Sequence, residues 1–181
     1  MLGRRLTLLT VTALALGLAA GCSRRQPPAT DDRGRVEPPP ATDTADADAD
    51  ADAQRRAEEE ARLARERAYG SIQDMIFFDF DRSDLREDAR QTLQLKAEAL
   101  RQFPDIRIRI EGHADERGTV EYNLALGERR ADAARAYLID LGIDSDRMTT
   151  ISYGEERPQV QGQNEAAWSQ NRRDEFVILG G

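Results

Sequence analysis

A carboxylate and a guanidinium occupy unusual positions near the middle of the chain. Asp115 lies in a short polar stretch, and Arg130 lies on the apolar row of the next segment, between Leu126 and Ala134. Arginine is rarely fully buried unless it is paired, and Asp115 is the nearest obvious partner. Two uses of this pair are open: a structural ion pair that holds a loop to a helix, or an open site that binds the opposite charges of a zwitterion.

The segments on either side of Asp115 have the periods of a strand and a helix. Residues 106–111 carry isoleucine at every second position, which is typical of a strand with one buried face. Residues 126–138 repeat leucine, arginine and alanine at intervals of four, which is typical of a helix that begins near Thr119. The pair is therefore expected between a strand end and a helix start, where α/β proteins often bind ligands.

Further strands and helices are expected around this unit. Apolar runs predict strands at residues 75–78, 148–153 and 175–179. Asp84, followed by Glu87, predicts the start of a helix that ends before Pro104, and Asn164 is expected to cap a short helix. Because strands alternate with helices, we expect an α/β fold with helices mostly on one face of the sheet.

The start of the chain has the pattern of a lipoprotein signal segment. Two arginines precede the apolar run 6–20, which is too short to span a membrane permanently, and small residues lead to Cys22. This resembles the lipobox of bacterial lipoproteins, although the usual leucine stands one position earlier, at Leu18. We expect residues 1–21 to be removed and Cys22 to be lipidated; the alternative is an ordinary secretory signal with a chance cysteine.

Composition divides the remaining chain into three parts. Residues 22–53 carry proline pairs and an Asp-Ala repeat that offers nothing to bury, which predicts a disordered linker. Residues 54–70 are rich in alanine, glutamate and arginine, with opposite charges four apart, which predicts a solvated helix. Residues 71–181 are expected to form the folded domain.

Charge and composition exclude several classes of function. The net charge of −8 argues against nucleic-acid binding. One cysteine and one histidine make an internal disulfide impossible and nearly exclude a Cys/His zinc site, so no metal or cofactor is expected. Glycan hydrolysis would need two carboxylates, such as Glu111, Asp115 or Glu116, but nothing marks one of them as an acid. His113 is expected to be a hydrogen-bonded structural residue, so we expect no enzyme.

A longer motif gives a family resemblance. The run Gly-His-Ala-Asp-Glu-Arg-Gly at 112–118, with Glu-Tyr-Asn at 121–123 and Leu-Gly-Glu-Arg-Arg-Ala at 126–131, resembles the OmpA-like peptidoglycan-binding domain. Its Ala-Asp-Glu-Arg-Gly form is most similar to the peptidoglycan-associated lipoproteins of the Tol-Pal system. The similarity covers roughly residues 72–179, including Asn-Arg-Arg at 171–173. It implies a two-layer sandwich with a mixed four-stranded sheet.

The same resemblance implies roles for individual residues. Asp115 is expected to bind the ammonium, and Arg130 the carboxylate, of diaminopimelate in a peptidoglycan stem peptide. Arg117 is expected on the outer side of the loop. Pocket-lining and loop-supporting roles are implied for Asp79, Phe80, Asp81 and Asn123.

The family's known partners imply a place in the cell envelope. The resemblance implies an outer-membrane lipoprotein that faces the periplasm and tethers this membrane to the cell wall, with roles in envelope integrity and cell division. TolB and other Tol proteins are the implied partners, on a surface that overlaps the wall site and includes Glu155, Glu156 and Trp168. The alternative is an OmpA-like lipoprotein that acts mainly as a periplasmic protein-interaction module.

Overall fold

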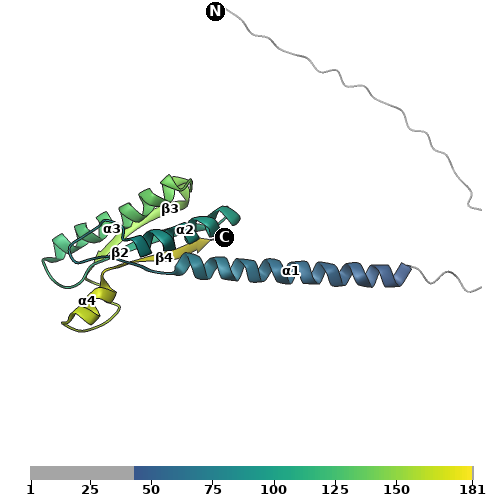
Figure 1. Ribbon diagram of the computed structural model, residues 1–181, viewed down its shortest axis with the longest axis horizontal. Helices are drawn as coiled ribbons and strands as arrows, with labels where there is room; N and C mark the ends of the chain where they lie inside the picture. The colour runs from purple at the N-terminus through teal and green to yellow at the C-terminus, as the bar shows by residue number, and fades with distance from the viewer. Residues whose placement is uncertain (1–42, 181) are drawn as a thin grey trace, which may run out of the picture. The chain divides into compact units, whose positions relative to one another are not determined.

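The computed structural model describes residues 43–180, so the predicted signal segment and Cys22 lie outside the described residues. Helices and strands alternate along most of the described chain (Figure 1). In chain order they are α1 (Asp43–Gln73), β1 (Ile76–Phe77), α2 (Glu87–Gln102), β2 (Arg107–His113), α3 (Val120–Asp140), a 3-10 turn (Ser145–Arg147), β3 (Met148–Gly154), α4 (Glu165–Asn171) and β4 (Arg173–Gly180). Within residues 43–180, no helix combines the length and the apolar character needed to cross a membrane.

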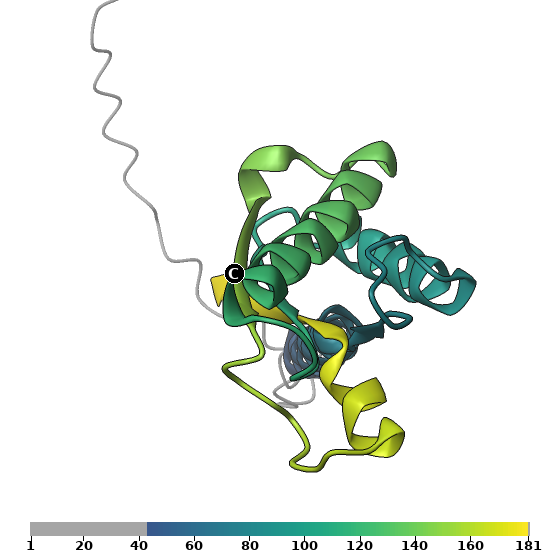
Figure 2. The same ribbon diagram turned by 90° about the vertical axis from the view of Figure 1, so that its left-hand side faces the viewer.

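The strands form the mixed sheet that the family resemblance implied. Their order is β1-β4-β2-β3; β2 and β3 are parallel, and the other neighbours are antiparallel. Figure 2 shows α2 and α3 side by side on one face of this sheet. The predicted fold class, an α/β two-layer sandwich with helices mostly on one face, is therefore confirmed.

The alternating isoleucines of β2 build the centre of the core. Ile106, Ile108 and Ile110 are fully buried and face the helices, where they meet apolar side chains of α2 and α3. The residues between them, such as Arg109, point to the opposite face of the sheet. This confirms the period of two that the sequence shows.

Two glycines bring α3 against the end of β2. A Cβ atom added to Gly112 would overlap the carbonyl oxygen of Gly127, and one added to Gly127 would overlap the hydroxyl of Ser152. Only residues without a side chain allow this close approach. It places Arg130, one turn further along α3, beside the end of β2.

The predicted boundary between linker and helix at residue 53 is wrong. α1 begins at Asp43, so the Asp-Ala repeat at 46–52 is helical. Alanine has the highest helix propensity, and carboxylates near a helix N-terminus are stabilised by the helix dipole. The domain boundary at residue 71 is also displaced, because Ala68 of α1 is already buried in the core.

The predicted start of α2 is also displaced. The helix begins at Glu87, and Arg86 occupies the N-cap without a side-chain hydrogen bond. Asp84, which was expected to cap it, instead accepts hydrogen bonds from Arg82, at 2.7 and 2.9 Å. Glu87 is therefore the first residue of the helix rather than its third, and Asp84 lies before the N-cap.

Lys96 fastens the end of α1 to α2. Its ammonium is fully buried and donates to the carbonyl oxygens of Ser71, Ile72 and Asp74 at the C-terminus of α1. It also lies over the ring of Phe176, 4.1 Å from the centroid. Burial lowers the pKa of Lys96 to about 7, because a low-dielectric environment disfavours the charged form.

We predict that this lysine makes stability depend on pH in the alkaline range. Between about pH 7 and 10 the unfolded chain keeps the Lys96 proton and the folded chain releases it, so the free energy of unfolding should rise with pH. One such group contributes at most about 1.4 kcal/mol per pH unit. Lys96→Met should remove this rise and cost ~1–3 kcal/mol at pH 9, because the helix carbonyls lose their donor. Urea melts across this range test it; parallel profiles for the two proteins would contradict it.

Candidate functional site

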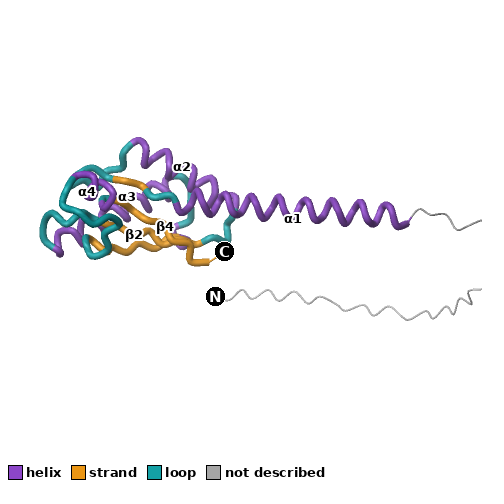
Figure 3. Tube along the Cα trace, turned by 90° about the horizontal axis from the view of Figure 1, so that it is seen from below, coloured by secondary structure: helices purple, strands orange, loops and turns teal. Residues whose placement is uncertain are grey.

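A pocket lies at the end of the sheet where three segments meet. The loop after β1, the loop after β2 and the first turns of α3 enclose a cavity of about 220 Å³. Figure 3 shows these loops gathered beside α4. The lining residues are Phe80, Asp81, Ala114, Asp115, Arg117, Gly118, Tyr122, Asn123, Leu126 and Arg130.

Arg130 forms the buried wall of this pocket. Its side chain is fully buried, and each of its three nitrogens donates to a backbone carbonyl: Nε to Arg82 at 2.8 Å, Nη1 to His113 at 2.8 Å and Nη2 to Asp79 at 3.1 Å. These acceptors come from the loop after β1 and from the end of β2. Arg130 therefore joins two chain segments that are distant in sequence.

The charge of Arg130 has no direct counter-ion among the described side chains. No carboxylate of residues 48–180 lies within 4 Å of its guanidinium. Burial lowers its pKa to about 10, partly offset by the charges of Asp174 and Asp115, so it stays protonated at neutral pH. A guanidinium has five N–H groups, of which the carbonyls use three, so donors remain for an anion.

Asp115 is also buried, but its charge is fully paired. Its Oδ1 accepts from the backbone N and the Nε of Arg117, at 3.1 and 3.0 Å; its Oδ2 accepts from Arg117 Nη2 at 2.8 Å and Arg172 Nη1 at 3.2 Å. Burial alone would raise the pKa of this carboxyl, but the bonds from Arg117 and Arg172 outweigh it and lower the pKa. The four donors occupy all of its acceptor sites.

Of the two uses that the sequence left open, the structural ion pair between Asp115 and Arg130 is therefore not formed. Both line the same pocket, but Asp115 pairs with Arg117 and Arg172, and Arg130 bonds only to carbonyls. Arg172 directly precedes β4, which the antiparallel pairing with β2 brings close to the end of that strand. Spacing along the chain could not reveal a partner that sheet pairing supplies.

The expected position of Arg117, on the outer side of the loop, is wrong. Arg117 lies over the mouth of the pocket. Its guanidinium lies 3.9 Å from the ring centroid of Phe80 and 4.2 Å from that of Trp168. It is therefore held between two aromatic rings while it binds Asp115, and cation–π contacts of this kind are individually worth ~0.5–1 kcal/mol at exposed sites. The Asn-Arg-Arg run in the sequence pointed to Arg172, but no sequence pattern predicted that Arg117 lies between two aromatic rings.

The other predicted site residues fall into two groups. Phe80 and Asp81 line the pocket, and Asp81 has a φ of 56° and accepts a hydrogen bond from Tyr122. Asn123 Nδ2 donates to the carbonyl of Arg117 at 3.3 Å and to Glu155 Oε2 at 2.5 Å, so it ties the loop to the next strand's end. Asp79 does not line the pocket; it contributes its carbonyl to Arg130, and its carboxylate lies 3.5 Å from Arg86.

The carboxylates that could have served a hydrolase do not converge. Glu111 points to the opposite face of the sheet, where Arg109 holds it at 2.6 Å. Glu116 accepts a hydrogen bond from Trp168 at 3.2 Å, and Asp115 is held by two arginines. Of these three carboxylates, only Asp115 lines the pocket.

Comparisons with known proteins place the chain in a family. The family model described as the OmpA family matches residues 77–172, more than half of the chain. A peptidoglycan-associated lipoprotein from Brucella melitensis biotype 1 is 54% identical over 110 residues, which are 61% of this chain and 66% of that protein, just under two thirds of its length. Another, from Pseudomonas aeruginosa, is 39% identical over 166 residues, 91% of this chain and 92% of that protein. The crystal structure of the peptidoglycan-associated lipoprotein from Burkholderia pseudomallei matches with a TM-score of 0.56 and 43% identity, over 57% of this chain and 88% of that one. The chain therefore belongs to the OmpA family, within the group of the peptidoglycan-associated lipoproteins.

Proposed function

We propose that the pocket binds peptidoglycan without covalent chemistry, through the diaminopimelate residue of a stem peptide, and that the protein thereby tethers the outer membrane to the cell wall. The observation that carries this proposal is Arg130, a buried cation with free donors at the wall of a pocket. A carboxylate of the ligand would supply the missing counter-charge through two parallel hydrogen bonds. The relatives' name, peptidoglycan-associated lipoprotein, supports this choice of ligand.

Asp115 is the proposed partner of the ligand's ammonium. Its acceptor sites are filled by Arg117 and Arg172, so the ammonium has to replace a donor. Arg117 is the donor that can leave, since its side chain is 29% exposed and Arg172's is 7% exposed. In the free protein Arg117 therefore occupies the place of the ligand's positive group.

We predict that removing either charge from the ligand weakens binding at least tenfold. A hydrogen bond to a charged group is worth about 1.5–3 kcal/mol, and tenfold corresponds to about 1.4 kcal/mol. The measurement is calorimetric titration of the unaltered protein with a diaminopimelate stem peptide and with two forms of it, one amidated at the far carboxyl and one acetylated at the far amine. A lysine-type stem peptide, which has the amine alone, should bind as weakly as the amidated form.

Altering the ligand is sharper here than altering the protein. Arg130→Lys would leave carbonyls unsatisfied, because one ammonium on a flexible stem cannot follow the guanidinium's fork, and the fold itself would weaken. Equal binding of all four peptides would remove Arg130 and Asp115 from the recognition of the charges. Failure of the unmodified peptide and of intact cell walls to bind would contradict the proposed function as a whole.

The membrane end of the tether is proposed to be Cys22. It is the only cysteine and follows the apolar run directly. Each buried CH₂ of an acyl chain adds ~0.8 kcal/mol, so several chains on one cysteine hold a protein stably. We predict that Cys22→Ser leaves an uncleaved or soluble protein that no longer partitions into a detergent phase. Unchanged membrane fractionation would contradict the anchor, whereas the wall-binding domain should be unaffected.

Tol proteins, TolB among them, are the proposed protein partners, in envelope integrity and cell division. The support is the surface around the pocket: Phe80 and Tyr122 are about half exposed, and Glu155 is bonded to Asn123 of the pocket wall. We predict that TolB and a stem peptide compete for this domain, because they would use one surface. Competition in a binding assay measures this, with Glu128→Gln on exposed α3 as a variant that should not change it. Simultaneous binding of both would favour the alternative, an interaction module whose protein surface lies elsewhere.

A further inference from the structure

The face of the sheet opposite α2 and α3 carries two glutamates that oppose each other. Glu111 of β2 and Glu175 of β4 are direct partners in the antiparallel register. Like charges at such positions repel each other and destabilise the pair unless something between them supplies positive charge. Glu111 is 5% exposed, so water screens this repulsion poorly.

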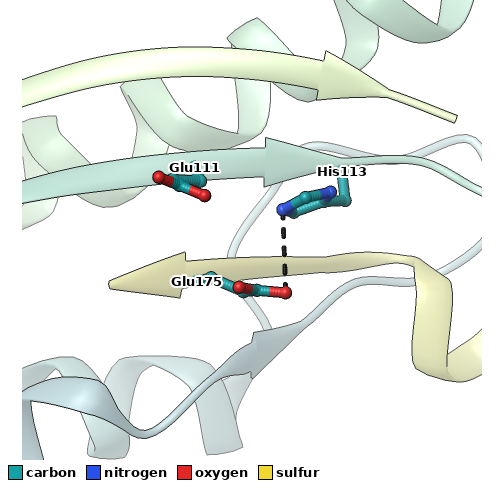
Figure 4. Close-up of side chains that lie close together, drawn as sticks. All are labelled: Glu111, His113 and Glu175. Carbon is teal, nitrogen blue, oxygen red and sulfur yellow. Dashed lines mark ion pairs between the residues drawn. The ribbon is translucent and has the colours of Figure 1, made fainter. Parts of the chain in front are cut away.

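His113 lies beside this pair, on the same face of β2. His113 is only 1% exposed. Neither of its ring nitrogens has a hydrogen-bond partner among the described residues. The expectation of a hydrogen-bonded histidine is therefore wrong for its side chain. Nε2 points toward Glu175 and lies 3.8 Å from its Oε1 (Figure 4). Burial, with the charge of Arg173, lowers the pKa of His113 to about 4, so the imidazole is neutral near pH 7.

Each glutamate keeps one oxygen free of hydrogen bonds. Arg109 Nε donates to Oε1 of Glu111, and its Nη2 lies 2.6 Å from the same oxygen; Arg173 donates twice to Oε1 of Glu175. Among residues 48–180, no donor is assigned to either Oε2. One oxygen from each glutamate and one nitrogen of His113 lie within 4.8 Å of one another. These atoms would have to move closer, to about 3.3–3.6 Å from one another, to bind one zinc ion at its usual bond lengths.

We propose that Glu111, His113 and Glu175 form a binding site for a zinc ion. An imidazole nitrogen with two carboxylates suits Zn²⁺, whereas Mg²⁺ and Ca²⁺ prefer sites made of oxygen alone. Three protein ligands leave a fourth position for water. The ion would supply the positive charge between the opposed glutamates and the partner that the buried ring lacks.

The neighbouring arginines shape this site in two ways. Arg109 and Arg173 orient the carboxylates by hydrogen bonds, as outer partners of metal ligands commonly do. Their charges, with that of Arg157 over the ring of Tyr153, oppose a divalent ion, so the affinity should be below that of a structural zinc site. Arg173 Nη1 is a buried donor without an acceptor, which a zinc-bound water would satisfy.

The metal site would also affect the pocket, because the backbone of His113 contacts Arg130 of the pocket and its ring belongs to the metal site. Its carbonyl accepts from Arg130 Nη1 at 2.8 Å, while its ring faces the glutamates. An ion on the ring would hold the end of β2 in place beneath Arg130. The metal site is nevertheless independent of the proposed ligand and can be tested without it.

The test is a titration of the full mature chain with zinc chloride. Calorimetry and NMR of the imidazole nitrogens monitor the binding. The chain has one histidine, so its ring signals are assigned without ambiguity. We expect one zinc ion per chain, a shift of a ring nitrogen, and no response to Mg²⁺ or Ca²⁺. Glu175→Gln, at a half-buried position, should keep the fold and raise the Kd for zinc at least tenfold.

Two controls separate this site from other acidic groups. Glu128→Gln, on the exposed face of α3, should leave zinc binding unchanged. A chain with Asp48, Asp50 and Asp52 all changed to Asn should also bind zinc normally, because these carboxylates belong to the exposed helix α1. Loss of binding in that chain, full binding by Glu175→Gln, or the absence of any shift at His113 would each overturn the proposal.

Discussion

The buried guanidinium of Arg130 is the constraint on which the rest of the domain depends. Its three nitrogens hold the loop after β1 and the end of β2 by their carbonyl groups. Because these acceptors are neutral, the fold satisfies the hydrogen bonds of the arginine without neutralising its charge. The same contacts that close the domain at this end therefore leave a cation facing a cavity. A stable fold requires the hydrogen bonds of a buried charge to be satisfied, whereas a binding site requires the charge itself to stay unpaired. Neutral carbonyl acceptors fulfil both requirements.

Asp115 is also a buried charge, but opposite charges neutralise it. Its charge is matched twice, by Arg117 of its own loop and by Arg172 just before β4. Arg172 also donates to the carbonyl of Phe78 at 3.1 Å, so it ties β1, β4 and the loop after β2 together. Arg117 contributes less to this framework, since it reaches Asp115 from the partly exposed side. The pocket thus has a buried cationic wall and an anionic wall that the partly exposed Arg117 covers.

Strand β2 and the residues after it reach three parts of the molecule, namely the core, the opposite face of the sheet and the pocket, because successive side chains of a strand point to opposite faces. Ile108 and Ile110 enter the core, and Glu111 and His113 lie buried on the opposite face of the sheet. Beyond the strand end, Asp115 turns into the pocket. Gly112 lets α3 approach this strand closely enough for Arg130 to reach the carbonyl of His113. A change at any of these positions is therefore felt on both faces of the sheet.

The sequence by itself determined the features that have a local signal. The alternation of isoleucines showed the buried face of β2, Asn164 marked the start of α4, and the run at 112–118 identified the family. The pocket residue Arg130 was found because a charge on an apolar row is itself informative, and Asp115 was found as the nearest carboxylate before that helix. Even the error at the start of α1 had a local cause, since an Asp-Ala repeat is compatible with both a linker and a helix.

Only the tertiary structure decided which residues meet across the fold. The second partner of Asp115, Arg172, comes from the residue before β4, the acceptors of Arg130 are backbone carbonyls, and Glu111 faces Glu175 through the strand register. A period shows the face on which a side chain lies, but not the distant segment that packs there. Backbone carbonyls leave no trace in residue types, so the bonds that hold Arg130 could not be read before the chain was folded.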